Sequence, residues 1–447
     1  MAFRKDALGT VPAERRDRWR NWAGNQICAP RRIHRPSTEA ELVLLVQQAA
    51  RDGERVKVVG SGHSFTAIAL TDGHLVDLAR YSAVLDADAT TGRVEVQAGI
   101  TLKRLNEELW RRGLALRNLG DVAYQTVSGA ISTGTHGTGL RFGCLATQVI
   151  GLRVVTGEGE VIECSADRDP EVFQAARVGL GAAGILSTVT LQAEPAFNLH
   201  ALERVEPLDE ILDRQDRLIE EHEHFEYFVG PMSTHAFTKR NNRTDRPAEP
   251  IPPWREWALD VALGWAGGNA VAHLNRVSPR LGGRVRRLLP SNEREDYVDR
   301  SYKVYTSERK VRFVEMEYFI PRQHAREALE RVRALVARSG WRISMPIEVR
   351  WTAPDDIPLS MCHGRETTSI AVHTRTFEPF QPYFEAVETI MRDYEGRPHW
   401  GKLHFQDAQT LQHRYPQWED FRATRRRLDP HGVFANPYLD RVLGPVK

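Results

Sequence analysis

Residues 56–64 limit the fold of this chain more than any other segment. Residues 56–59 (VKVV) are typical of a β-strand, and they run directly into the turn 60–64 (GSGHS). A Rossmann dinucleotide fold would need a third glycine and an immediate long helix. Here Phe65 occupies the third position, and another strand is predicted just after Gly73. What remains is a tight turn whose backbone N–H groups could bind a pyrophosphate.

A second glycine-rich segment lies at residues 125–139 (QTVSGAISTGTHGTG). It has four glycines and six serine or threonine residues in fifteen positions, which allow close backbone approach and offer many hydrogen-bond donors. A Ser/Thr-rich loop without a ligand would have the same composition. Because both segments fall in one predicted α/β region, we expect them to hold a large, phosphate-bearing cofactor.

Size and charge restrict the class of protein. The chain has 447 residues, enough for two or three domains, and a formal net charge of +2. That balance gives no general attraction to nucleic acid or anionic lipid. The four cysteines lie far apart, and residues 1–22 lack the apolar stretch of a secretory signal. Residues 257–274 are apolar but include polar side chains, so we interpret them as core or interface. We expect a cytoplasmic protein without an integral membrane segment.

The predicted elements change in character near Pro195. Before it, short strands alternate with helices, including a helix that begins at the capping signal Thr38 and a hairpin over residues 152–164. After it, to about residue 410, longer helices alternate with polar strands. Residues 312–320 and 343–351 alternate like strands with one solvent- or ligand-facing side.

The motifs carry a family resemblance. Residues 60–64 together with 133–139 (TGTHGTG) resemble the FAD domain of the vanillyl-alcohol-oxidase flavoproteins. Within that family the chain is similar to the sugar-1,4-lactone oxidoreductases, which include gulonolactone, arabinonolactone and galactonolactone enzymes and the alditol oxidases. The match extends from residues 19–26 (WRNWAGNQ) to residues 429–436 (DPHGVFAN).

The resemblance implies an α+β fold with two main domains. An FAD-binding domain (25–195) of the PCMH type would have two α/β subdomains. A substrate domain (196–410) would carry a large antiparallel sheet. An N-terminal segment (1–24) would precede them, and a C-terminal segment (411–447) would return to the FAD domain.

The resemblance also implies a covalent cofactor, because the histidine of the family's GxGHS motif bonds to the 8-methyl carbon of the flavin. His63 holds this place. Some relatives have leucine there and bind FAD non-covalently. Relatives with a second link use a cysteine near residues 120–124, where this chain has none. The other expected cofactor contacts are Gly60, Ser61, Gly62, Ser64, Gly120, Ser128, Ser132, Thr133, Gly134, His136, Gly184 and Ile185.

The expected catalytic residues lie in the second half of the chain. Glu348 and Arg350 stand two apart on a predicted strand, so their side chains share a face. Arg350 could stabilise reduced flavin or hold substrate oxygens, whereas an exposed ion pair is the alternative. In residues 399–402 (HWGK), the resemblance places Lys402 between flavin and substrate. His399 would position or deprotonate a substrate hydroxyl, or be purely structural. No metal site is predicted.

Three further positions bear on substrate and oxygen. Thr126 and His373 are expected to contact the substrate, and His373 replaces a threonine of the alditol oxidases, which favours lactones. Gly120 matches a position above the flavin where alanine can block oxygen. A glycine there leaves a path that permits oxidase behaviour.

The implied function is FAD-dependent oxidation of an aldono-1,4-lactone, of the L-gulono or D-arabinono type, to an ascorbate-like product. Hydride would pass to flavin N5 and electrons to O2 or another acceptor. One alternative is an alditol (polyol) oxidase that produces an aldose and H2O2. Another is a catalytically silent flavin-binding protein. Substrate stereochemistry, the electron acceptor and the oligomeric state stay open.

Overall fold

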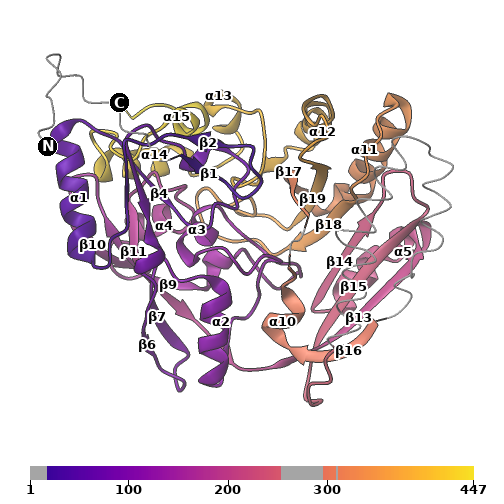
Figure 1. Cartoon of the computed structure of the whole chain (residues 1–447). Helices are drawn as coiled ribbons and strands as arrows, with labels where there is room; N and C mark the ends of the chain where they lie inside the picture. The colour runs from indigo at the N-terminus through magenta and orange to yellow at the C-terminus, as the bar shows by residue number, and fades with distance from the viewer. Residues whose placement is uncertain (1–17, 253–294, 309–310, 447) are drawn as a thin grey trace, which may run out of the picture.

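The glycine turn follows a strand of a small parallel sheet. The computed structural model describes residues 18–252, 295–308 and 311–446 (Figure 1). The sheet has the order β3 (Arg32–His34), β5 (His74–Asp77), β4 (Val56–Val59). Helix α1 (Glu39–Asp52) connects β3 to β4; the Thr38 side chain caps it as expected, and Gly53 ends it with φ 66°. Residues 60–64 therefore lie at the carboxyl edge of this sheet.

A five-stranded antiparallel sheet lies beside it and includes the expected hairpin, which is confirmed as β9 and β10. Its order is β10 (Val161–Ser165), β9 (Val149–Val155), β11 (Ile185–Gln192), β7 (Arg93–Gln97), β6 (Val84–Ala87). The helices that pack with these sheets are α2 (Leu102–Arg111), α3 (Val127–Ser132) and α4 (Pro170–Arg177). Apolar side chains from both sheets and these helices form one core.

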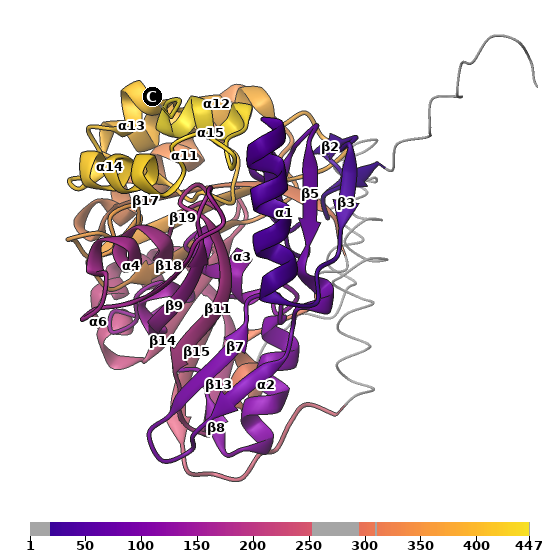
Figure 2. The same cartoon turned by 90° about the vertical axis from the view of Figure 1, so that its left-hand side faces the viewer.

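The C-terminal residues complete the same core. Helices α13 (Ala408–Leu411), α14 (Trp418–Leu428) and α15 (Pro437–Leu443) contribute buried side chains to it, and Figures 1 and 2 show them grouped at one end of the molecule. The Val56 N–H donates to the Val433 carbonyl at 2.8 Å. The Lys57 ammonium donates to the Phe434 carbonyl at 3.1 Å. Asn436 donates to the carbonyls of Ala67, Ile68 and Leu70. Residues 433–436 are thus bound to β4 and the segment that follows it.

The third large sheet has eight strands, all paired antiparallel, as expected for the substrate domain. Its order is β16 (Glu295–Arg300), β13 (Asn198–Pro207), β15 (His235–Thr244), β14 (His224–Val229), β18 (Ile347–Thr352), β19 (Thr367–Arg375), β17 (Phe313–Pro321), β20 (Arg397–Pro398). Strand β18 begins four residues later than the predicted 343–351 strand, directly after Pro346, which has no N–H to donate to a sheet.

The two faces of this sheet differ because side chains alternate along each strand. On β17, Val314, Met316 and Tyr318 pack in a core with helices α11 (Ala325–Ser339) and α12 (Gln381–Asp393). Helices α5 (Leu208–Asp213) and α6 (Gln215–Glu221) contribute to the same core. Glu315 and Glu317 lie on the opposite face and are also buried. The polar face is therefore covered as well, and it contributes to the site described below.

The remaining short elements are β1 (Trp19–Arg20), β2 (Ile27–Cys28), β8 (Leu114–Ala115), β12 (Glu194–Pro195) and α10 (Ser301–Tyr305). None of the described helices is long and apolar enough to cross a membrane. Residues 257–274, interpreted from sequence as core or interface, lie outside the described residues. All four cysteines are free thiols.

Candidate active site

Two adjoining cavities follow the glycine-rich segments. They contain about 880 Å³ and 730 Å³ of empty space, solvent-open parts included. The first lies along the turn 60–64 and α3. The second lies between the turn, residues 120–122, the segment 399–402 and the polar face of the eight-stranded sheet. Both are lined by His63, Ser64, Gln125 and Thr133. His63 therefore stands where one cavity passes into the other.

The first cavity has the donors that a pyrophosphate needs. The backbone N–H groups of residues 61–64 donate to no acceptor among the described residues. The hydroxyls of Ser64, Ser128 and Ser132 likewise make no hydrogen bond within the described chain, and all three residues line the cavity. Successive free N–H groups form a concave anion site. This part of the protein fits the phosphate-bearing portion of FAD.

Most predicted site residues line one cavity or the other. Lining the first are Gly60, Ser61, Gly62, His63, Ser64, Thr126, Ser128, Ser132, Thr133, Gly184 and Ile185. Lining the second are His63, Ser64, Gly120, Thr133, His136, Glu348, Arg350, His399 and Lys402. Gly134 and His373 line neither cavity. Gly134 has φ 73°, and a Cβ there would come 2.8 Å from the Cε of Met361, so backbone geometry and packing account for this glycine.

Two expectations from sequence do not match the geometry. Thr126, expected at the substrate, lines only the first cavity, and its Oγ1 accepts the Gly129 N–H at 3.2 Å to cap α3. It therefore lines the cavity that has the pyrophosphate donors and not the second cavity. Gly120, expected to leave a path for oxygen, does line the second cavity, but its missing Cβ would come 2.8 Å from Thr135 Cγ2 and 3.0 Å from His136 O. Thr135 and the His136 carbonyl fill that space, so glycine is required there for packing.

Arg350 is the centre of a buried ion-pair cluster. Its Nε lies 2.6 Å from Glu226 Oε2, and its terminal nitrogen Nη2 contacts Glu348 and lies 3.8 Å from Asp121 Oδ2. Glu348 and Arg350 share one face of β18 as expected, but their side chains are only 8% and 9% exposed, so the surface-pair alternative is wrong. Burial raises the pKa of Glu348, and Arg350 offsets this only in part. The acidic neighbours raise the pKa of Arg350 despite its burial.

A second buried chain of charges connects to the first. The Lys402 ammonium contacts Glu315, and His373 Nε2 lies 3.4 Å from Glu315 Oε1 and 3.8 Å from Glu348 Oε2. Burial would lower the pKa of His373, but Glu315 and Glu348 raise it. Burial would raise the pKa of Glu315, but Lys402 and His373 lower it. His373 thus acts on the cavity through these two carboxylates, since it does not line the cavity itself.

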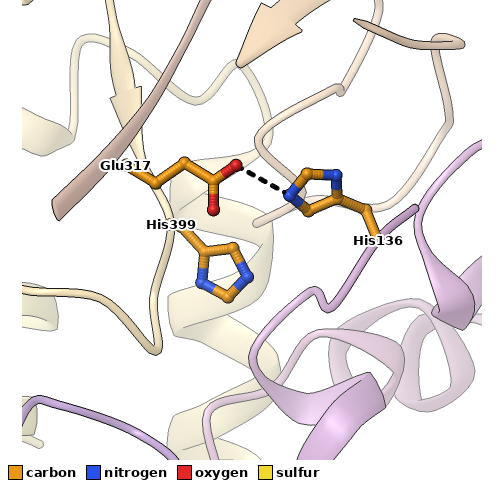
Figure 3. A group of neighbouring side chains, drawn as sticks. All are labelled: His136, Glu317 and His399. Carbon is orange, nitrogen blue, oxygen red and sulfur yellow. Dashed lines mark hydrogen bonds and ion pairs between the residues drawn. The ribbon is translucent and has the colours of Figure 1, made fainter. Parts of the chain in front are cut away.

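His136, Glu317 and His399 form a third group, drawn in Figure 3. His136 Nε2 lies 3.0 Å from Glu317 Oε1, and its Nδ1 lies 2.8 Å from the Gly137 carbonyl. Both ring nitrogens therefore face oxygen acceptors. Burial would raise the pKa of Glu317, but His136 lowers it well below its ordinary value. The two side chains form a buried ion pair.

His399 in this group has a defined tautomer. Its Nδ1 accepts the Gly401 N–H at 3.0 Å, so the proton lies on Nε2. Burial lowers the pKa of His399 to about 3, which keeps the ring neutral. One ligand atom from each residue of the group lies within 4.8 Å of the others, a spacing open to a metal ion. The tautomer argues against a metal ligand, because the Nε2 lone pair is occupied by the proton.

The residues missed from sequence are mainly carboxylates. Glu315, Glu317 and Asp121 line the second cavity, and Glu226 pairs with Arg350. Part of the signal is in the sequence, since the alternation of residues 312–320 predicts a strand with one solvent- or ligand-facing side. Lys402, the partner of Glu315, is 87 residues away in the sequence, and His136, the partner of Glu317, is 181 residues away. No local motif marks such pairs.

Two comparisons bear on the fold and the cofactor. The chain is similar to the solved structure of a solvent-stable cholesterol oxidase, with a TM-score of 0.78, 19% identity, and coverage of 96% of this chain and 97% of that one. At that identity the likeness concerns the fold alone. Residues 30–165 match the family described as FAD binding domain. The class is therefore that of the vanillyl-alcohol-oxidase flavoproteins, oxidoreductases that bind FAD.

Residues 189–442 match the family described as D-arabinono-1,4-lactone oxidase. The chain belongs to this family. It is 48% identical to the L-gulono-1,4-lactone dehydrogenase of Mycobacterium tuberculosis over 96% of this chain and 99% of that protein. It is 35% identical to the L-gulonolactone oxidase of Bos taurus, over 95% and 98%. The alditol oxidase of a Streptomyces species is 31% identical, over 95% and 98%.

Proposed function

We propose that this protein oxidises an aldono-1,4-lactone of the L-gulono or D-arabinono type, using FAD bonded covalently to His63. The observation that carries the proposal is the junction at His63. A cavity with pyrophosphate donors opens there into a cavity lined by charged side chains. Bound FAD would accept a hydride from the substrate carbon. The oxidised keto-lactone would then enolise to an ascorbate-like ene-diol.

The second cavity suits a small, neutral, polyhydroxylated substrate. Glu348 and Glu315 offer acceptor oxygens, while Lys402 and the His399 Nε2–H offer donors. Because burial raises the pKa of Glu348, this carboxylate is better matched than an exposed one to accept a hydroxyl proton near neutral pH. Lys402, held by Glu315, would polarise the same hydroxyl. His399 is assigned a positioning role, since its Nδ1 is already occupied and its ring stays neutral.

The environment of His63 supports the proposed covalent bond. Burial, followed by the nearby positive charge of Lys402, lowers the pKa of His63 to about 4. The imidazole is therefore neutral and keeps a lone pair available for bonding. Electrons from the reduced enzyme would pass to O2 or to another acceptor.

The decisive experiment is anaerobic. Purified enzyme is mixed with L-gulono-1,4-lactone or D-arabinono-1,4-lactone, and the visible flavin absorbance is followed. Bleaching is expected, and it should slow strongly in Glu348→Gln. Admitting air then shows whether O2 restores the colour. A flavin that neither lactone bleaches would contradict the proposed substrate.

The covalent link has a separate test. Flavin should remain with the polypeptide after acid precipitation and fluoresce in a denaturing gel. His63→Ala should release it. Release from the unsubstituted protein would refute the covalent bond and leave the lactone proposal standing.

Alditol oxidation is the second candidate, favoured by the alditol oxidase relative. A polyol presents the same hydroxyl groups to the second cavity. Bleaching by xylitol or sorbitol but by neither lactone would replace the first proposal with this one. A flavin that no sugar derivative reduces would instead support the silent-protein alternative.

A further inference from the structure

The ring of His63 is held in an unusual way. Among the described residues it makes no hydrogen bond, so no backbone carbonyl or carboxylate orients it. The contact that fixes its plane is the indole of Trp22, with ring centroids 5.3 Å apart and an interplanar angle of 27°, a stacked arrangement. An imidazole that must react at a defined position is normally oriented by a partner at its second nitrogen. Here an aromatic face takes that role.

Trp22 is itself fixed on several sides. Its backbone N–H donates to the Gly62 carbonyl at 2.8 Å. Its ring meets Phe65 and Phe313 edge-on, at centroid distances of 6.4 Å and 5.4 Å. The indole therefore has one defined position relative to the His63 ring.

The segment around Trp22 also clamps the turn. Asn21 Nδ2 donates to the Ser64 carbonyl at 2.9 Å, and the side chains of Asn25 and Gln26 donate to the Phe65 carbonyl at 2.9 and 3.0 Å. These bonds fix the residues that follow His63, and the bond from the Trp22 N–H to the Gly62 carbonyl fixes the residue before it. The stacked rings of Trp22 and His63 and the turn at residues 60–64 thus form one rigid unit.

We propose that Trp22 is a positioning residue for flavin attachment: its indole face orients the His63 imidazole so that a ring nitrogen points at the 8-methyl carbon of FAD. This inference rests on the proposed covalent bond. It assigns no part in substrate oxidation to Trp22. Neither ring nitrogen of His63 makes a hydrogen bond within the described chain, and the residue lines both cavities.

The bond-forming step sets what must be positioned. One C–H bond of the 8-methyl group and one N–H bond of the imidazole break, and a C–N bond forms. Two protons and two electrons are released, which reduce the flavin and then O2 to H2O2. The attacking nitrogen needs its lone pair, consistent with the neutral ring of His63. Attack also needs alignment, and a misplacement of about 1 Å can slow such a step about a hundredfold.

The test follows covalent attachment directly. FAD-free protein is mixed with excess FAD in air, and samples are denatured at intervals and separated on a gel. Flavin fluorescence per unit of protein gives the attachment rate. In Trp22→Leu we expect that rate to fall about ten- to a hundredfold, while FAD still binds non-covalently. Trp22→Phe, which keeps an aromatic face, should restore most of the rate.

Controls separate this inference from the proposals it rests on. Trp22→Met provides a second non-aromatic side chain. If Trp22→Leu does not fold, the attachment rates of Trp22→Phe and Trp22→Met are compared instead. Flavin attachment as fast as in the unsubstituted protein in Trp22→Met or Trp22→Leu would overturn the inference. Slow flavin attachment in Trp22→Phe would also overturn it. Unsubstituted protein that never becomes fluorescent would refute the covalent bond itself.

Discussion

The buried pair of His136 and Glu317 gives a prediction with a definite magnitude. Their side chains are 3% and 6% exposed and lie 3.0 Å apart. Removing one partner of a buried pair costs about 3–5 kcal/mol, because the other charge stays buried. In Glu317→Gln the amide keeps the volume and one acceptor oxygen, so we expect the lower end of this range. Unfolding entropy of about 2.1 cal/mol/K per residue, taken over 447 residues, converts this into a Tm about 3 °C lower.

Differential scanning calorimetry of the FAD-loaded enzyme, with equal flavin content, provides the measurement. The matched control is Glu419→Gln, another Glu-to-Gln exchange, at a carboxylate that is 66% exposed and paired with Arg422 at i,i+3. An exposed pair of this kind contributes about 0.5 kcal/mol or less. Equal shifts in the two variants would refute the view that Glu317 is a charged, buried partner. So would a Glu317→Gln enzyme that is more stable than the unsubstituted protein.

Three further outcomes are expected. Gly120→Ala should lose about 1–3 kcal/mol of stability through overpacking against Thr135, visible as a lower Tm; an unchanged Tm would contradict this. The pKa of His373 is higher in the folded protein than in the unfolded chain. Protonated His373 therefore stabilises the fold fully below the unfolded pKa of about 6.5, and this stabilisation is lost as the pH rises through the higher folded pKa. The difference in Tm between the unsubstituted protein and His373→Gln should therefore shrink between pH 6 and pH 9. A difference that grows with pH would contradict this prediction. His373→Thr should shift kcat/KM toward polyols over lactones; unchanged selectivity counts against the subtype assignment.

Sequence reasoning was most successful where function depends on local backbone. The turn at residues 60–64 and the segment 125–139 are expected from their composition to approach a ligand, and residues of both line the first cavity. The ExR spacing placed Glu348 and Arg350 on one face, because alternation along a strand is a local property. The family resemblance predicted the large antiparallel sheet. It also pointed to the HWGK segment, of which His399, Gly401 and Lys402 line the second cavity.

Sequence reasoning failed where the partner lies on a distant element. Glu315 and Glu317 look like ordinary strand residues until β17 is placed beside Lys402 and His136. Gly120 is expected from sequence to leave a path for oxygen to the flavin, because glycine has no Cβ. The position of Thr135, which fills that space, depends on the folding of a separate loop. Thr126 is expected to contact the substrate, but its hydroxyl caps α3 and the residue lines the first cavity.

The contacts of residues 433–436 bear on the order in which the FAD cavity forms during synthesis of the chain. Domains generally fold as they leave the ribosome, N-terminal parts first. Here the ammonium of Lys57, which lines the FAD cavity, has its acceptor at Phe434, 377 residues later in the sequence. Asn436 likewise fastens the segment after the glycine turn. The segment that lines the FAD cavity therefore gains these contacts only after residues 433–436 have been synthesised.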